Sequence, residues 1–279
     1  MYMDKLIINL TPTGVIPTKE MISHVPITPD EIVNDVILCY KLGVQMVHLH
    51  VRDENGQNSL DPKLYGIVIR RIRKECPDII ICASLSGRVI NTFEARSAVL
   101  DLEGDEKPDM GSLTLSSMNF LQNASVNTPE MIISLLTKMN EKCIKPELEV
   151  FDVGMVNFSK YLIKKGLLKP PYYYNILLGN IFSAQANLED LHCIINALPE
   201  NSIYCLAGLG NYQKKANALG IIMANGVRVG LEDNIHYDEE RKILASNERL
   251  VQRIVNIAKA YGKEIASPKE VRELLLIKN

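Results

Sequence analysis

The stretch VHLHVRD, residues 47–53, places two histidines one residue apart within a run of apolar residues. Side chains of a strand alternate between its two faces, so His48 and His50 project from the same side, with Cα atoms about 6.5 to 7 Å apart. Arg52 shares that parity. Two imidazoles at this spacing can bind one metal ion, provided that the fold supplies a third ligand.

A carboxylate is the expected third ligand. The chain has five histidines, and His24, His192 and His236 fall in loop or helix contexts. The run VRVGL is followed by Glu232 and Asp233, and its alternation places Glu232 at the C-terminal tip of a strand. Two imidazoles and one carboxylate are typical of zinc with an open coordination position, and they also match the facial triad of non-haem iron. We predict zinc.

Two further acids alternate in PELEVFD. Glu147 and Glu149 share one face of a predicted strand, and Leu148 and Val150 share the other. If the apolar pair packs under helices, the acids point inward, where a buried carboxylate needs a partner. Arg228 lies on the same face of its predicted strand as Glu232, and it is an available partner for Glu149. The pairing is compatible with a structural or a catalytic role.

Small residues follow three other strand-like runs. ASLSGR supplies Ser84 and Gly87, and GSLTL supplies Ser112, as hydroxyl or backbone donors suited to a carboxylate. In GLGNYQKK, Gly208 and Gly210 precede a helix start. This loop is either a tight turn or a cradle for the phosphates of a coenzyme.

The elements that must position these residues alternate regularly. Strand-like runs occur at residues 5–10, 44–51, 78–84, 110–115, 147–151, 172–178, 202–207 and 227–231. Helical patterns occur at residues 28–43, 62–76, 91–100, 128–143, 157–166, 187–198, 212–226 and 246–262, and a ninth helix at 268–277. We therefore predict a (β/α)8 TIM barrel, a single domain over residues 1–279 with an extra C-terminal helix. Catalytic groups of this fold gather at the C-terminal ends of the strands.

Composition narrows the classes of partner. The 279 residues are 47% hydrophobic, and 31 basic against 33 acidic residues give a formal charge of −2. This charge gives no reason to expect nucleic acid or an anionic membrane as partner. No signal-peptide pattern or long apolar segment is evident, so a cytoplasmic location is expected. The six cysteines form no CxxC pair, which favours reduced thiols.

Several motifs resemble the beta-keto acid cleavage enzymes, whose type activity is 3-keto-5-aminohexanoate cleavage. They are TPTGVIPT, PITPDEI, HLHVRD, NTFEAR, SLTLSSMNF, PELEVFDVGM, GLGNYQ, RVGLEDN and ASNERLVQR, and they run nearly from end to end of the chain. The combination of HLHVRD with RVGLEDN is very specific.

The resemblance implies a zinc-bearing TIM barrel, usually a homotetramer, that reacts a β-keto acid with acetyl-CoA to give acetoacetate and a new acyl-CoA. The implied zinc ligands are His48, His50 and Glu232. The implied proton-handling group is Asp233, supported by Arg228 and Glu149. The implied contacts to the carboxylate or keto oxygen of the substrate are Ser84, Gly87 and Ser112. A divalent ion would act as a Lewis acid and stabilise the enolate that a base creates.

The sequence departs from the family pattern at the substrate pocket. The usual STGG is SLSG here, and Thr114 and Ser116 replace the usual asparagine and glycine. Members that accept amino-bearing keto acids offer a carboxylate in the first loop, where this chain has Ile16. An ammonium-bearing substrate is therefore disfavoured, and an apolar or neutral side chain is expected.

Two other functions are compatible with a metal-binding barrel. Metal-dependent hydrolases also use an HxH pair, but they usually bring more histidines from later strands and often a lysine. A catalytically silent barrel would bind a keto acid without turnover, and the presence of Arg228 and Asp233 is evidence against it.

Overall fold

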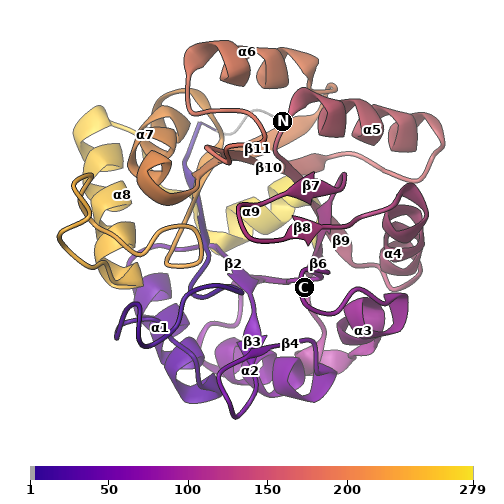
Figure 1. Cartoon of the computed structure of the whole chain (residues 1–279), viewed down its shortest axis with the longest axis horizontal. Helices are drawn as coiled ribbons and strands as arrows, with labels where there is room; N and C mark the ends of the chain where they lie inside the picture. Colours follow the sequence, from indigo (N-terminus) through magenta and orange to yellow (C-terminus); the bar gives the residue numbers. More distant parts are fainter. Residues whose placement is uncertain (1–3, 279) are drawn as a thin grey trace.

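The computed structural model describes residues 4–278, in which eight parallel strands close into a barrel (Figure 1). The strands in chain order are β1 (Ile7–Leu10), β2 (Met46–Leu49), β5 (Ile80–Ala83), β6 (Met110–Thr114), β9 (Lys145–Val150), β10 (Tyr172–Leu178), β11 (Ser202–Gly208) and β12 (Gly226–Val229). Strand β1 pairs with β2 on one side and with β12 on the other. This confirms the TIM barrel. Strand β2, which carries the histidines, and strand β12, which carries Arg228, lie on either side of β1.

Between residues 4 and 278, eight helices surround the barrel in chain order (Figure 1). They are α1 (Pro29–Lys41), α2 (Pro62–Glu75), α3 (Phe93–Ser97), α4 (Pro129–Glu141), α5 (Val153–Lys164), α6 (Leu188–Ala197), α7 (Gln213–Met223) and α8 (Asn247–Tyr261). The helix expected at residues 91–100 is shorter, because the chain changes to the 3-10 turns η1 (Ala98–Asp101) and η2 (Gly104–Glu106) after α3. Among the described residues, no helix is both long and apolar enough to cross a membrane.

Helix boundaries follow the capping residues that the sequence shows. Thr28 and Glu31 form a capping box at the start of α1, with Pro29 in the first turn. Helix α8 ends at Gly262, which adopts a left-handed conformation with φ 86°. Local sequence therefore sets where these helices begin and end.

The apolar residues form two layers that leave one end of the barrel for polar groups. Outward-facing residues such as Leu148 and Val150 pack under the helices, as predicted. Inside the barrel, Ile7 and Met46 pack with Val271 of α9 (Pro268–Leu275). Figure 1 shows α9 crossing behind the middle of the ring of helices. The interior is thus closed at the N-terminal ends of the strands and polar at the opposite end.

Two short hairpins lie beyond the C-terminal ends of the strands. One pairs β3 (Val51–Arg52) with β4 (Asn58–Ser59), and the other pairs β7 (Met118–Asn119) with β8 (Ala124–Ser125). Arg52 therefore belongs to a hairpin and not to the barrel strand that carries the histidines. It donates to the carbonyl oxygens of the first loop, including Pro17 at 2.8 Å.

Candidate active site

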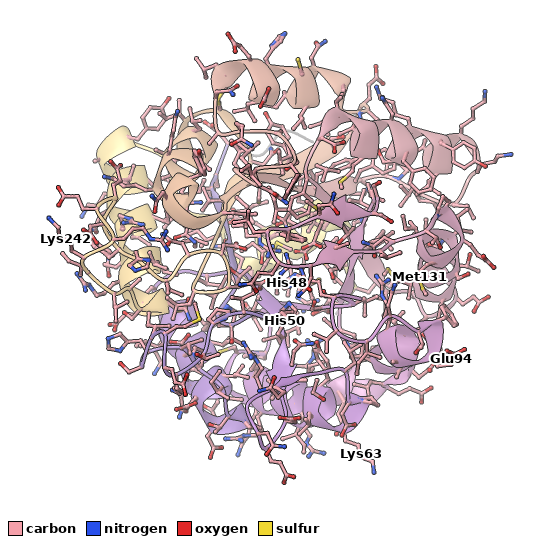
Figure 2. All side chains as sticks on the ribbon, viewed as in Figure 1. His48, His50, Lys63, Glu94, Met131 and Lys242 are labelled. Carbon is pink, nitrogen blue, oxygen red and sulfur yellow. The ribbon has the colours of Figure 1, made fainter. Side chains whose placement is uncertain are left out.

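The two histidines lie together at the end of β2. His48 is within the strand, His50 follows its last residue, Leu49, and the ring centroids are 5.4 Å apart. His48 Nδ1 donates to Glu147 at 2.5 Å, and His50 Nδ1 donates to Asn58 Oδ1 at 2.9 Å. Figure 2 shows both side chains close to the axis of the barrel. Because each Nδ1 atom is occupied, each ring is oriented to offer Nε2 to a metal ion.

The turn after β12 carries Glu232. The sequence placed this residue at the tip of the strand, which was wrong: β12 ends at Val229, and residues 231–233 form a turn. Gly230, the first residue after the strand, lies against the backbone of Thr11, where a side chain would collide. The turn still brings Glu232 Oε1 within 3.5 Å of His50 Nε2.

The donor set fits a divalent metal ion. Ligand atoms of His48, His50 and Glu232 all lie within 4.8 Å of one another. Glu232 Oε2 is buried and has no hydrogen-bond partner among the described residues, a costly arrangement that an ion would relieve. Burial lowers the pKa of His48, but nearby carboxylates raise it to about 9. The same negative potential favours a bound cation.

Arg228 connects the three acids beside these ligands. Its Nε and Nη2 atoms donate to the two oxygens of Asp233 at 3.0 and 3.1 Å. Its remaining bonds reach Glu149 and Glu232, each at 2.9 Å. The predicted partnership of Arg228 with Glu149 is therefore observed. Burial raises the pKa of Asp233 even though Arg228 acts in the opposite direction, which suits a proton acceptor.

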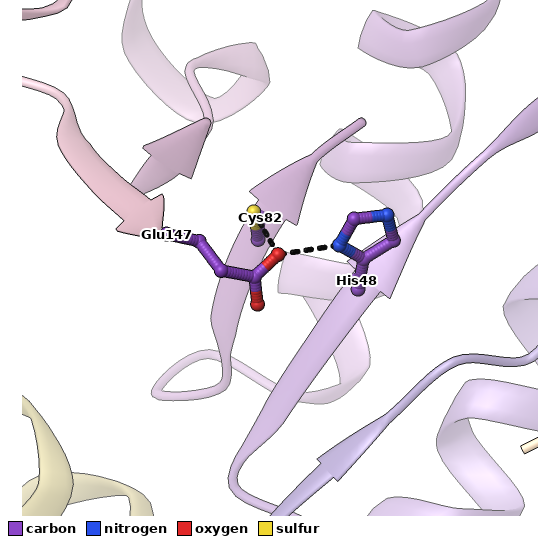
Figure 3. A group of neighbouring side chains, drawn as sticks. All are labelled: His48, Cys82 and Glu147. Carbon is purple, nitrogen blue, oxygen red and sulfur yellow. Dashed lines mark hydrogen bonds and ion pairs between the residues drawn. The ribbon is translucent and has the colours of Figure 1, made fainter. Parts of the chain in front are cut away.

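Behind His48 lies a second group of hydrogen-bonded side chains (Figure 3). Glu147 accepts from His48 and, at 3.2 Å, from the thiol of Cys82, while Asn9 donates to its other oxygen at 2.8 Å. Burial raises the pKa of Cys82 well above its ordinary value, so the thiol stays protonated. Both oxygens of Glu147 are thus occupied, and the group orients His48. The parity of Glu147 predicted its inward direction but not this partner.

The predicted substrate contacts lie at the same end of the barrel. Ser84 directly follows β5, and the Ser112 hydroxyl accepts a hydrogen bond from Leu85 N at 3.0 Å. A side chain on Gly87 would approach Arg96 Nη1 to 2.8 Å, and Arg96 donates to Leu85 O at 2.7 Å. The three residues therefore shape the loop after β5. Contact with substrate stays a prediction.

The glycines of the loop after β11 act in a tight turn. A side chain on Gly208 would collide with the backbone of Tyr212. Gly210 has φ 57°, and its amide donates to Asp233 O at 2.8 Å. Because that amide already has a partner, the turn interpretation is favoured over the phosphate cradle. Coenzyme binding at these glycines stays a prediction, and the turn instead holds the segment of Asp233.

Sequence reasoning missed two residues that position the Glu232 carboxylate. Gly14 leaves room for Glu232, since a side chain at Gly14 would collide with it. Asn247 accepts from Leu231 N at 2.8 Å and donates to Pro12 O at 2.9 Å. Each contact joins segments far apart in the chain. The glycine in TPTG was the one available signal for the first of them.

Known proteins similar to this chain identify its family. The chain matches the beta-keto acid cleavage enzyme family over residues 5–277. It belongs to that family. A 3-keto-5-aminohexanoate cleavage enzyme of Fusobacterium nucleatum is 38% identical over 99% of each chain. A 3-oxoadipate:acetyl-CoA acetyltransferase of Cupriavidus necator is 29% identical over 96% of this chain and 94% of that one.

The fold of this cleavage-family enzyme also resembles a solved structure, apo ObcA. The TM-score is 0.80 at 19% identity, and the match covers 91% of this chain and 66% of that one. At this identity the likeness supports the barrel alone. The two relatives are named as an enzyme that cleaves a β-keto acid and an enzyme that transfers an acetyl group from acetyl-CoA.

Proposed function

We propose that this protein condenses a β-keto acid with acetyl-CoA, in a zinc-dependent reaction, to give acetoacetate and a new acyl-CoA. One observation carries the proposal: the ligand atoms of two histidines and Glu232 converge within 4.8 Å, beside an Asp233 whose two oxygens are fixed by one guanidinium. The names of the relatives support the reaction class and acetyl-CoA as co-substrate. A cytoplasmic homotetramer is part of the proposal.

The metal-binding residues in this proposal are His48, His50 and Glu232. When bound there, zinc supplies a Lewis acid for the carbonyl and carboxylate oxygens of the keto acid. The protein orients its ligands beforehand: Glu147 holds His48, and Asn58 holds His50. These contacts occupy Nδ1 of both rings, so Nε2 is the atom that would face the ion, which would replace a proton there.

Asp233 is the proposed base that removes the proton between the two carbonyl groups. Its burial favours the protonated form, and Arg228 fixes the direction of both oxygens. Glu149 holds Arg228 from the opposite side at 2.9 Å. The guanidinium therefore opposes the effect of burial on the pKa of Asp233 and holds both of its oxygens in position.

The substrate end of the site is proposed to lie along the loop after β5. Ser84, Gly87 and Ser112 would hold the carboxylate or keto oxygen of the acid through hydroxyl and amide donors. In the first loop, Ile16 supplies no negative charge. An ammonium-bearing side chain would have no counter-ion at that point, so such substrates are disfavoured.

The direct test incubates zinc-loaded protein with acetyl-CoA and a panel of β-keto acids, and follows acetoacetate and new acyl-CoA by mass spectrometry. We expect both products in equal amounts. Glu232→Gln keeps the size of the side chain but removes its charge, so it should lose both bound zinc and turnover. Loss of keto acid without transfer of CoA would instead support a hydrolase, and binding without turnover would support a silent binding barrel.

A further inference from the structure

Arg88 lies in the loop after β5, and no polar side chain or backbone group of the described residues is bonded to it. It is half-buried, and its guanidinium carbon lies 3.5 Å from the centroid of the Phe120 ring. Among residues 4–278 it forms no hydrogen bond or ion pair. A guanidinium carries five N–H donors and stays charged in proteins. Arg88 therefore presents unused donors at the polar end of the barrel.

The aromatic contact fixes the position of this guanidinium. Phe120 follows strand β7 in the hairpin with β8, and it packs edge to face on Phe151 at a centroid distance of 6.0 Å. Phe151 directly follows β9, the strand that carries Glu149. The loop of Arg88, the hairpin and the end of β9 thus meet in one stack, which holds the charged group in place at low entropic cost.

The guanidinium is close enough to the acids of the site to sense them electrostatically. Burial lowers the pKa of Arg88, and the charges of Glu232 and Glu149 act in the opposite direction. Both carboxylates are already bonded to Arg228. Arg88 therefore lies beside the site without bonding to its acids. Its N–H donors are within reach of a small molecule held between the loops.

We propose that Arg88 determines specificity by binding a carboxylate at the far end of the β-keto acid, so that the enzyme acts on dicarboxylic β-keto acids. This inference rests on the proposed function. The planar guanidinium matches a carboxylate through two parallel hydrogen bonds, and Phe120 leaves its edges free. The inference revises the sequence-based expectation of an apolar or neutral side chain, which rested on Ile16 and did not consider Arg88.

A phosphate of acetyl-CoA offers the same anionic chemistry. The position of Arg88, half-buried and four residues after Ser84 in the same loop, favours the smaller substrate. Kinetics with each substrate varied in turn distinguish the two sources. A group that binds the keto acid changes the preference between acids, whereas a group that binds coenzyme changes the KM for acetyl-CoA with every acid.

The test compares two β-keto acids of equal chain length, one ending in a carboxylate and one in a methyl group. Zinc-loaded wild type should have the higher kcat/KM for the dicarboxylic acid. In Arg88→Met, the ratio of the two kcat/KM values should fall roughly 10- to 100-fold, as expected for loss of a charge-assisted contact. Arg88→Lys should keep part of the preference, because it retains the charge without the planar fork.

Arg71→Met is the matched control, since Arg71 is an exposed arginine of α2 paired with Asp30. It should leave the ratio unchanged. Circular dichroism verifies folding, and Arg88→Gln provides the same ratio if Arg88→Met does not fold. An unchanged ratio in the folded variant overturns the inference. So does an equal rise in the KM for acetyl-CoA with both acids, which would assign Arg88 to a coenzyme phosphate.

Failure of the proposed function is distinguishable from failure of this inference. If wild type turns over neither acid, calorimetry without acetyl-CoA measures binding of the same two acids. Weaker binding of the dicarboxylic acid to Arg88→Met than to wild type would retain the inference although the reaction is different. Equal binding to both proteins would overturn it.

Discussion

Two buried arginines, one at each end of the barrel, show how a site differs from a structural ion pair. At the polar end, Arg228 gives its hydrogen bonds to carboxylates, namely those of Glu149, Glu232 and Asp233. At the closed end, Arg272 of α9 divides its bonds between the Asp109 carboxylate and the backbone oxygens of Asp78, Ile79 and Lys278. Both side chains are almost inaccessible to solvent.

The two ends differ in whether every carboxylate oxygen bonded to or beside the arginine has a hydrogen-bond partner. At the closed end, the oxygens of Asp109 also accept from Arg73 and from Ile81 N, so both oxygens of this carboxylate have hydrogen-bond partners. At the polar end, three acids surround one guanidinium, and Glu232 Oε2 has no partner among the described residues. An unsatisfied acceptor beside excess negative charge indicates a place for a cation, whereas a satisfied network indicates stability alone.

The largest expected effect comes from Arg228→Met. Removing the guanidinium leaves three buried carboxylates without their partner, and Asp233 loses its orientation. We expect kcat/KM to fall at least about 1000-fold, together with a stability loss of about 3 to 5 kcal/mol. Steady-state kinetics and urea denaturation measure the two effects. Activity within tenfold of wild type would remove the functional half of the comparison.

Arg272→Met should separate stability from activity. Asp109 would keep Arg73 as a partner, but the hydrogen bond from Arg272 of α9 to the backbone oxygen of Ile79 would be lost. We expect a stability loss of about 3 kcal/mol, with kcat of the folded enzyme within about twofold of wild type. Urea denaturation and kinetics at low temperature provide the two values. A large fall in kcat would show that the closed end is coupled to the site.

Glu147→Gln tests the support of the metal ligands with little change of volume. The amide cannot provide the negative charge that holds His48, so metal affinity should fall about 10- to 100-fold. Competition with a chelator measures the affinity. Asn256→Gln, on the exposed side of α8, is the control and should leave metal affinity unchanged. Unchanged affinity would show that Glu147 has only a packing role.

Asp35, a largely buried acid that forms no ion pair with any residue between 4 and 278, gives the smallest expected effect. Burial raises its pKa from 3.8 to about 6, although Asn247 donates to it at 2.6 Å. A raised pKa favours folding at low pH, and this contribution is lost as pH rises from about 4 through 6. The free energy of unfolding of Asp35→Asn should therefore rise by about 2 to 3 kcal/mol relative to that of wild type between pH 4 and 7.

Urea denaturation of both proteins across that pH range tests this directly. The quantity to compare is the difference between their unfolding free energies at each pH, so that contributions from other groups cancel. A difference that does not change with pH would mean that Asp35 titrates normally in the folded protein.

The parts of the site that were predictable are those that depend on short stretches of sequence. Alternation along one strand placed His48 and His50 on the same side, and the order of eight strand and helix pairs implied that their strand would lie close to that of Arg228. Capping residues and apolar periodicity fixed the helices in the same way. In each case the pattern arises from the geometry of a single element.

Only closure of the barrel decided which side chains meet. The bond from His48 to Glu147 spans 99 positions, and that from Asn247 to Pro12 spans 235. Glu232 reaches the histidines from the turn after β12, and this turn packs so closely on Thr11 that only glycine fits at position 230. The sequence alone determined the residue types and their parity, since these depend on short-range periodicity. The partners depended on tertiary packing, because no local rule relates segments so far apart in the chain.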